Sequence, residues 1–182
     1  EITCRDWSSD VCSSDLLKHN GLLFLIAAAV IVVDQITKAI VRQNLALGEA
    51  WAPIPAIGDF FRFLYWQNRG AAFGTLQNAG PILTVVRIAI AIFIIVFYQK
   101  AEIRDTLMKV ALSLMLGGAV GNLVDQFTLG FVTDFIAVGR FPIFNIADSA
   151  VTIGVSLMLL DMLIKEKNGA KTDPEAKSDE NA

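Results

Sequence analysis

The chain has 182 residues, of which 54% are hydrophobic, and its mean hydropathy is +0.56. This apolar share exceeds the roughly 45–50% of an ordinary soluble domain, so the composition favours a protein that resides in lipid. The net charge of −3 indicates neither a nucleic-acid-binding surface nor a polybasic membrane patch.

The first fifteen residues, EITCRDWSSDVCSSD, differ in character from the rest of the chain. They are polar, rich in serine and aspartate, and without helical or strand periodicity, and they resemble a translated sequencing adapter. We therefore expect residues 1–15 to be a non-native leader, so that the true N-terminus is missing. Both cysteines, Cys4 and Cys12, lie in this stretch, and we infer neither a disulfide nor a metal site from them.

Four later stretches are long and apolar enough to span a bilayer, which requires about 20 helical residues. They cover about residues 21–41, 81–98, 107–124 and 145–164. Four such segments in so short a chain leave too little polar sequence to cover them in water. We therefore predict an all-α integral membrane protein, with a four-transmembrane-helix bundle in a domain over residues 16–167.

The connections between these spans differ in kind. The first contains WAPIPAIGDFFRFLYWQNRGAAFG, whose aromatic residues, prolines and glycines predict a small extracytoplasmic β element between helices 1 and 2. The second is the short charged turn QKAEIRD, and the third is QFTLGFVTDFIAVGRFPIF. The tail, residues 168–182, is poor in apolar residues, and we expect it to be a disordered cytoplasmic segment.

Basic residues near the span ends predict the orientation. The positive-inside rule favours both termini in the cytoplasm, with the first and third connections outside. The basic residues then gathered on the cytoplasmic side are Lys18, Lys100, Arg104, Lys109, Lys165 and Lys167.

Ionisable residues inside spanning helices cost roughly 2.5–3.5 kcal/mol each on insertion scales, so each needs a reason. In the string DQITK of the first span, Asp34 and Lys38 are four residues apart and share a helix face. They form either a structural ion pair near the outer membrane edge or part of a binding site. Asp161, near the inner end of the fourth span, is interpreted as interfacial.

The third span ends in GGAVGNLVDQ. Its glycines, Gly117 and Gly121, form a small-xxx-small pattern that lets two helix backbones approach closely. Asn122 and Asp125 then project from one face just beyond the glycines. Close packing explains the glycines, but it does not explain an amide and an acid at the membrane edge.

The fourth span opens with FNIADSAV, in which Asn145 and Asp148 repeat the three-residue spacing of Asn122 and Asp125. Asp134, in the string VTDF, lies between the last two spans. The three acids Asp125, Asp134 and Asp148 can therefore converge at the outer boundary, unless they are solvated surface residues. Their spacing leaves open which two of them pair.

Two carboxylates held a few ångströms apart cannot both ionise cheaply, so one keeps a proton above the ordinary Asp pKa of about 3.9. Such a pair can activate a water while it hydrogen-bonds a scissile carbonyl, as aspartic proteases do. Two alternatives remain. A small membrane transporter or ion-binding bundle would use the same acids to relay protons or cations. A divalent-metal hydrolase would use all three as oxygen ligands.

Five strings together resemble the bacterial lipoprotein signal peptidase (signal peptidase II) family. They occur in the order of the family and span essentially residues 18–167: DQITK, NRGAAF, GGAVGNLVD, VTDF and FNIADSAV. The resemblance implies a four-helix membrane aspartic endopeptidase of the bacterial inner membrane, acting as a monomer and without metal or other cofactor. Its substrates would be diacylglyceryl-modified prolipoproteins, cleaved just before the lipidated cysteine, with an active site near the outer face.

By motif, the resemblance assigns the catalytic pair to Asp134 and Asp148. It assigns substrate-binding or supporting positions to Asp34, Lys38, Asn68, Gly70, Asn122, Asp125 and Asn145. One departure concerns the residue after Asp125, which is usually arginine in the family and is Gln126 here. We therefore expect a missing cationic partner at Asp125, or its replacement by Arg140.

Overall fold

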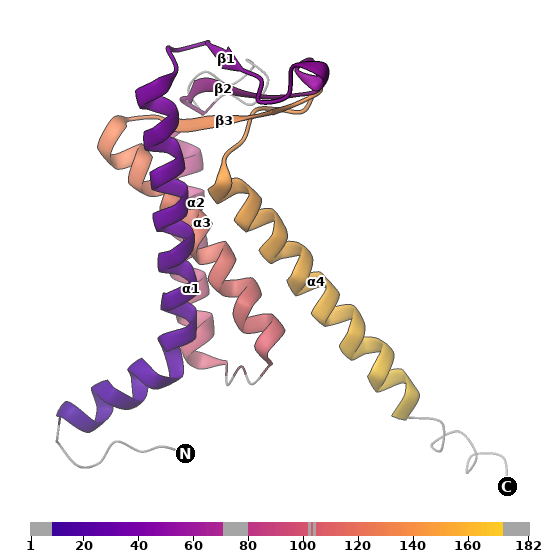
Figure 1. The fold of residues 1–182 in the computed structure, drawn as a ribbon. Helices are drawn as coiled ribbons and strands as arrows, with labels where there is room; N and C mark the ends of the chain where they lie inside the picture. The colour runs from indigo at the N-terminus through magenta and orange to yellow at the C-terminus, as the bar shows by residue number, and fades with distance from the viewer. Residues whose placement is uncertain (1–8, 71–79, 102, 104, 173–182) are drawn as a thin grey trace, which may run out of the picture.

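The computed structural model describes residues 9–70, 80–101, 103 and 105–172, which form four helices and three strands. The helices are α1 (Ser9–Asn44), α2 (Gly80–Lys100), α3 (Thr106–Leu129) and α4 (Ile146–Thr172), with a 3-10 turn, η1 (Pro55–Ile57). The strands are β1 (Ala50–Trp51), β2 (Phe61–Asn68) and β3 (Val132–Val138). Figure 1 shows the sheet across one end of the helices, while α4 diverges from α1 toward the other end.

All four predicted spans are confirmed as helices long and apolar enough to cross a membrane, over residues 21–44, 80–100, 106–129 and 146–167. The third span continues five residues beyond the predicted end at 124. Its helix ends only at Gly130, which adopts a left-handed conformation (φ 77°) that glycine tolerates best, and whose N–H donates to the Gln126 carbonyl. At the other end, the Asp105 carboxylate accepts the Leu107 N–H as an N-cap.

The two terminal segments extend the first and last helices, α1 and α4. Residues 9–15 of the expected leader belong to α1, and residues 168–172 of the expected tail belong to α4. The remaining parts of both predictions, residues 1–8 and 173–182, lie outside the described residues.

The predicted β element between the first two spans is confirmed, and it is larger than expected. β1 and β2 pair antiparallel, and β3, from the connection between α3 and α4, adds a third antiparallel strand to β2. The pairing of β2 with β3 shifts register between Phe63 and Trp66, and Trp66 then lies opposite Asp134. The sheet thus joins two connections that are far apart in the sequence.

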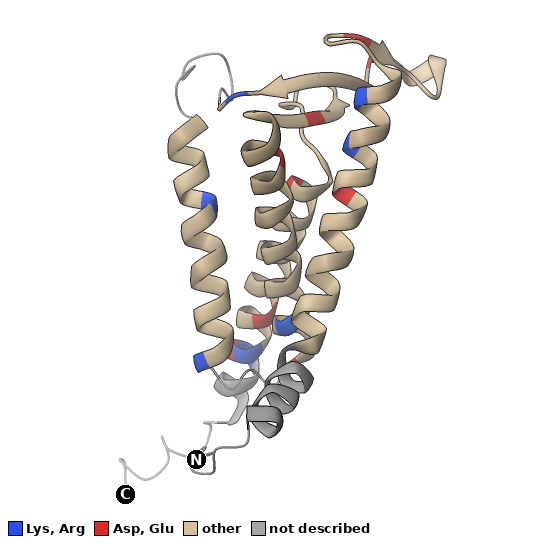
Figure 2. Cartoon of the chain, turned by 90° about the vertical axis from the view of Figure 1, so that its left-hand side faces the viewer, with Lys and Arg blue, Asp and Glu red and all other residues tan. Residues whose placement is uncertain are grey.

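α3 is the central helix of the bundle, and its spanning segment is the most buried of the four. Small residues allow its neighbours to approach. A Cβ on Gly117 would lie 2.8 Å from the Ala27 carbonyl oxygen of α1, and a Cβ on Gly118 would collide with the Ala147 carbonyl of α4. Leu23, Ile94 and other residues form an apolar core at the end away from the sheet. Charged residues of the described chain lie mainly toward the two ends of the helices (Figure 2).

Candidate active site

Asp134 lies on β3 and is buried, with 1% of its surface exposed. Its Oδ2 accepts a hydrogen bond from Asn68 Nδ2 (2.9 Å), and its Oδ1 accepts one from Asn145 Nδ2 (2.7 Å). Burial, and after it the negative charge of Asp148, raises the pKa of Asp134 to about 7, although the two amides oppose this shift. The carboxyl group is therefore one that keeps a proton near neutral pH.

Asp148 lies in the first turn of α4 and is only half-buried. Its Oδ1 accepts a hydrogen bond from Asn122 Nδ2 (2.8 Å), and its Oδ2 accepts one from the Asn145 backbone N–H (3.3 Å). In return, the Asp148 N–H donates to Asn145 Oδ1 (2.9 Å), a reciprocal cap at the start of the helix. The helix N-terminus favours a negative charge at this position.

Asn145 and Asn122 connect the two acids. The Asn145 side-chain amide lies within hydrogen-bonding distance of both Asp134 Oδ1 and Asn122 Oδ1, and the Asn122 amide donates to Asp148. Because the Asp148 N–H occupies Asn145 Oδ1, the Nδ2 of Asn145 must point toward Asp134. The network thus brings together residues from α3, β3 and the start of α4.

Asn68, at the end of β2, is oriented in a similar way. Its Oδ1 accepts the Gly70 N–H (2.9 Å), so its Nδ2 is left to donate to Asp134. Gly70 has φ 108°, in the region that favours glycine, which explains why no side chain is tolerated well there. The rest of the NRGAAF string, from Ala71, lies outside the described residues.

A second buried cluster adjoins the two acids. Lys38 Nζ lies 2.8 Å from Asp34 Oδ2, 3.4 Å from Asp125 Oδ2 and 3.0 Å from Asn122 Oδ1. Asp34, Lys38 and Asp125 are each fully buried. The pairing of Asp34 with Lys38 predicted from their spacing is therefore present, and it lies within the protein rather than at its lipid-exposed surface.

Comparison with known proteins identifies the family. The sequence model described as "Signal peptidase (SPase) II" matches residues 26–164, well over half of the chain. The chain belongs to the signal peptidase II family. It is 43% identical over 148 residues to the lipoprotein signal peptidase of Shouchella clausii, covering 81% of this chain and 96% of that protein.

Other relatives agree with this membership. The lipoprotein signal peptidase of Moorella thermoacetica is 38% identical over 140 residues, covering 77% of this chain and 91% of that protein. A solved structure described as a bacterial membrane enzyme, at 2.3 Å resolution, matches with a TM-score of 0.73 and 37% identity over 81% of this chain and 91% of the other. The family resemblance predicted from the five strings is therefore confirmed, as is the fold.

The expectation for the cationic partner of Asp125 is wrong. In this member of the family, Asp125 Oδ2 faces Lys38 and Asp125 Oδ1 lies 3.7 Å from Arg42 Nη1, so α1 supplies both cations. Arg140 is exposed at the turn after β3. Gln126, which is half-buried, donates instead to the Gly130 carbonyl (3.3 Å).

Sequence reasoning missed three residues around Asp125. Gln35 Nε2 donates to Asp125 Oδ1 (3.1 Å), Arg42 Nη1 donates to Thr133 Oγ1 (2.9 Å), and the Thr133 N–H donates to Asp125 Oδ2 (2.8 Å). The four-residue spacing of Lys38 and Arg42 was a usable signal, because it places both cations on one face of α1. Thr133 gave no signal, because it contacts Asp125 through its backbone N–H.

The three acids Asp125, Asp134 and Asp148 do not form one ligand set. The described residues contain no group of three or more His, Cys, Asp or Glu side chains arranged to hold a metal ion. Asp125 turns toward the cations of α1, whereas Asp134 and Asp148 are linked through the asparagines. The arrangement therefore separates Asp125 from the other two.

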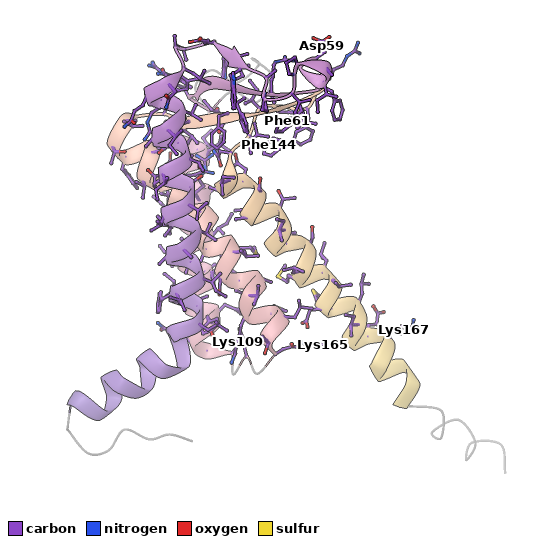
Figure 3. The ribbon with its side chains drawn as sticks, in the orientation of Figure 1. Asp59, Phe61, Lys109, Phe144, Lys165 and Lys167 are labelled. Carbon is purple, nitrogen blue, oxygen red and sulfur yellow. The ribbon has the colours of Figure 1, made fainter. Side chains whose placement is uncertain are left out.

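Asp161 lies at the opposite end of the bundle from this site, and it is covered by the protein, with 3% of its surface exposed. Its Oδ2 lies 2.6 Å from Lys165 Nζ, four residues later on α4. Figure 3 shows Lys165 and Lys109 at this end and Phe144, which precedes Asn145, at the sheet end.

A cavity of about 610 Å³ lies between the end of α1 and the sheet. Its walls include Val41, Trp51, Phe63 and Phe135. Because successive side chains on a strand point to opposite faces, Phe135 contacts this cavity while Asp134 points away from it. The cavity is therefore separate from the site formed by the two acids.

Proposed function

We propose that this protein is an aspartic endopeptidase in which Asp134 and Asp148 form the catalytic dyad. Its function is that of its family, removal of signal peptides from prolipoproteins. The observation that carries the proposal is the linked pair of acids, one buried and one half-buried, whose carboxyl oxygens accept hydrogen bonds from Asn68, Asn122 and Asn145. The other neighbouring acids of the described chain share a lysine instead: Asp34 and Asp125 share Lys38, and Asp105 and Asp161 share Lys165.

The different surroundings of the two acids support different roles. Asp134, with a pKa of about 7, is the member that holds the proton, and Asp148, at the helix N-terminus and closer to solvent, is the ionised member. The two groups interact, because the negative charge of Asp148 contributes to the raised pKa of Asp134.

In the proposed reaction, a water molecule attacks the carbonyl carbon of the scissile peptide bond. Asp148 removes a proton from this water while Asp134 donates its proton to the carbonyl oxygen, which gives a tetrahedral diol. Asp148 then transfers its new proton to the leaving nitrogen as the C–N bond breaks. Asp134 recovers a proton from the diol hydroxyl, so both acids return to their starting states.

The proposed substrates are diacylglyceryl-modified prolipoproteins, cleaved just before the lipidated cysteine. Several relatives carry the name lipoprotein signal peptidase, and the four apolar spans suit an enzyme whose substrate is held in lipid. Asn68 and Gly70 lie at the end of β2 beside Asp134, where they are suited to line the path of the substrate backbone.

A cleavage assay on a diacylglyceryl-prolipoprotein tests the proposal. Wild-type enzyme should release the signal peptide, whereas Asp134→Asn and Asp148→Asn should release none. Asp59→Asn removes an exposed acid at the sheet end and should cleave normally (Figure 3). Normal turnover by either dyad variant, or loss of activity after exhaustive chelation, would contradict the aspartic mechanism.

We also propose a monomer in the bacterial inner membrane, with both termini in the cytoplasm and the dyad near the outer face. The sheet end of the bundle then lies outside, and Lys100, Lys109 and Lys165 lie at the cytoplasmic end, in agreement with the positive-inside rule. A cysteine placed at Asp59 should react with a membrane-impermeant thiol reagent in intact spheroplasts. A cysteine at Lys167 should react only after lysis.

A further inference from the structure

Asp34 and Asp125, which lie outside the proposed dyad, play matching parts in the structure. Asp34 Oδ1 accepts the backbone N–H of Ala147 (3.0 Å), the residue before Asp148. Asp125 Oδ2 accepts the backbone N–H of Thr133 (2.8 Å), the residue before Asp134. Each of these acids thus holds the main chain one residue ahead of a member of the dyad.

Lys38 joins these two acids. Its Nζ lies 2.8 Å from Asp34 Oδ2 and 3.4 Å from Asp125 Oδ2, and its side chain is fully buried. A third contact, with Asn122 Oδ1 (3.0 Å), uses the remaining donor capacity of the ammonium group. A single cation therefore connects α1, α3 and, through the two acids, the segments that carry Asp148 and Asp134.

Lys38 also determines how the Asn122 amide is turned. An ammonium group can only donate hydrogen bonds, so it faces Oδ1 of Asn122 and leaves Nδ2 to donate to Asp148 (2.8 Å). Without the cation, the amide loses a contact that fixes this orientation.

We propose that Lys38 is a positioning residue that ties together the two backbone segments carrying Asp134 and Asp148 and so fixes the separation of their carboxyl groups. This inference rests on the proposed dyad. Lys38 acts through Asp34, Asp125 and Asn122. Its role is to hold the two carboxyl groups at the separation at which both can contact one water molecule.

The expected kinetic signature follows from this role. A displacement of about 1 Å in a catalytic group can lower the rate about 100-fold, even when the change lies away from the reacting atoms. Because Lys38 lies behind the dyad, its loss should lower kcat by about 100-fold while KM changes about twofold or less. A residue that merely stabilises the fold would instead lower the amount of active enzyme.

The experiment compares Lys38→Met with the double variant Lys38→Met/Asp34→Asn. The single variant leaves two buried carboxylates without their shared cation, so it should lose thermal stability as well as kcat. The double variant removes one of these charges and keeps an oxygen to accept the Ala147 N–H. Asp125 keeps its contacts with Gln35 and Arg42. The double variant should therefore recover most of the thermal stability, and its kcat should remain about 100-fold low.

Arg87→Met provides the matched control, since Arg87 is a cation in a spanning helix with no ion pair among the described residues. It should keep both kcat and stability. A double variant with kcat within about twofold of the wild type would overturn the positioning role, because catalysis would not need the contacts of Lys38 with Asp34 and Asp125. If Asp134→Asn and Asp148→Asn were inactive in the same assay, the proposed dyad would still stand. Active dyad variants would instead refute the proposed function itself.

Discussion

The two ends of the bundle contain the same local motif, an aspartate followed four residues later by a lysine. At the sheet end, Asp34 and Lys38 lie 2.8 Å apart, and both side chains are inaccessible to solvent. At the other end, Asp161 and Lys165 lie 2.6 Å apart, but the Lys165 side chain is 54% exposed. The same spacing on a helix therefore produces a fully buried ion pair, Asp34 with Lys38, and a partly solvated one, Asp161 with Lys165.

The surroundings of each lysine explain the difference. Lys38 contacts groups that reach both proposed catalytic acids, whereas Lys165 extends from α4 to Asp105 at the start of α3 (3.1 Å). The hydrogen bond from Lys165, together with the Leu107 N–H, lowers the pKa of the Asp105 carboxyl. The pair of Asp161 and Lys165 thus connects α4 to α3, whereas the pair of Asp34 and Lys38 contacts the groups around the proposed dyad. Four predictions test this contrast.

The largest expected effect is the loss of either dyad acid at the sheet end. Asp148→Asn should lower kcat by about 10⁴-fold or more, because an amide cannot remove a proton from water. Asp161→Asn, at the opposite end, should leave kcat unchanged. Single-turnover cleavage in detergent micelles measures both variants. Similar rates for Asp148→Asn and Asp161→Asn would erase the distinction between the two ends.

The second prediction compares the lysines directly. Lys38→Met breaks a fully buried ion pair, which typically costs about 3–5 kcal/mol, and it should also lower activity. Lys165→Met removes a half-exposed cation that pairs with both Asp105 and the buried Asp161, so it should also destabilise the protein, but it should leave kcat unchanged because this pair lies at the opposite end from the site. Unfolding in mixed micelles gives the free energy, and the cleavage assay gives kcat. The contrast fails if Lys165→Met lowers kcat as much as Lys38→Met does.

The third prediction concerns the close contact of α3 with α4 beneath the site. A Cβ at Gly118 would meet the carbonyl of Ala147, the residue before Asp148, so Gly118→Ala should destabilise the protein by about 1–3 kcal/mol. Gly21→Ala, on α1 toward the other end, adds a Cβ with no atom within 4 Å. It should be neutral or stabilising by about 0.5–1 kcal/mol. Equal unfolding free energies for the two variants would show that the helices separate freely at Ala147.

The smallest expected effect is a shift in pH dependence. In the proposed mechanism the protonated form of Asp134 is the active one, so kcat/KM should fall as the pH rises through about 7. The hydrogen bond from Asn68 favours the ionised form and lowers this pKa, so Asn68→Ala should move the fall to higher pH. Gln67→Ala removes a neighbouring amide that instead contacts the Tyr65 hydroxyl, and it should leave the profile in place. A shift to lower pH in Asn68→Ala would refute the assignment of the proton to Asp134.

Hydropathy and helix spacing predicted the spans, and the pairing of Asp34 with Lys38, because both are local properties of the chain. The same reasoning did not predict that Lys38 reaches Asp125 or Asn122. Those contacts join residues more than eighty positions apart, and no local signal records such packing. The third strand was missed for the same reason, since β3 forms only where β2 lies beside it.

The error at Asp125 has a physical origin. Arg140 was expected as a possible cationic partner of Asp125, but the turn after β3 leaves it exposed while α1 brings Lys38 and Arg42 to the acid. Sequence position also did not show that Asp161 is covered by the protein and paired with Lys165. At both positions the packing of neighbouring helices determines the contacts of the acid.

The chain order of the site has a consequence for the making of the enzyme. Asp34 and Lys38 lie on the first helix, Asn122 and Asp125 on the third, Asp134 on the last strand, and Asp148 on the last helix. A chain that emerges from the N-terminus onward cannot complete the proposed dyad until α4 has entered the membrane and its first turn has met Asp34. Proteolytic activity would therefore arise only at the final stage of assembly, and a partly inserted chain would pose no risk to the peptides around it.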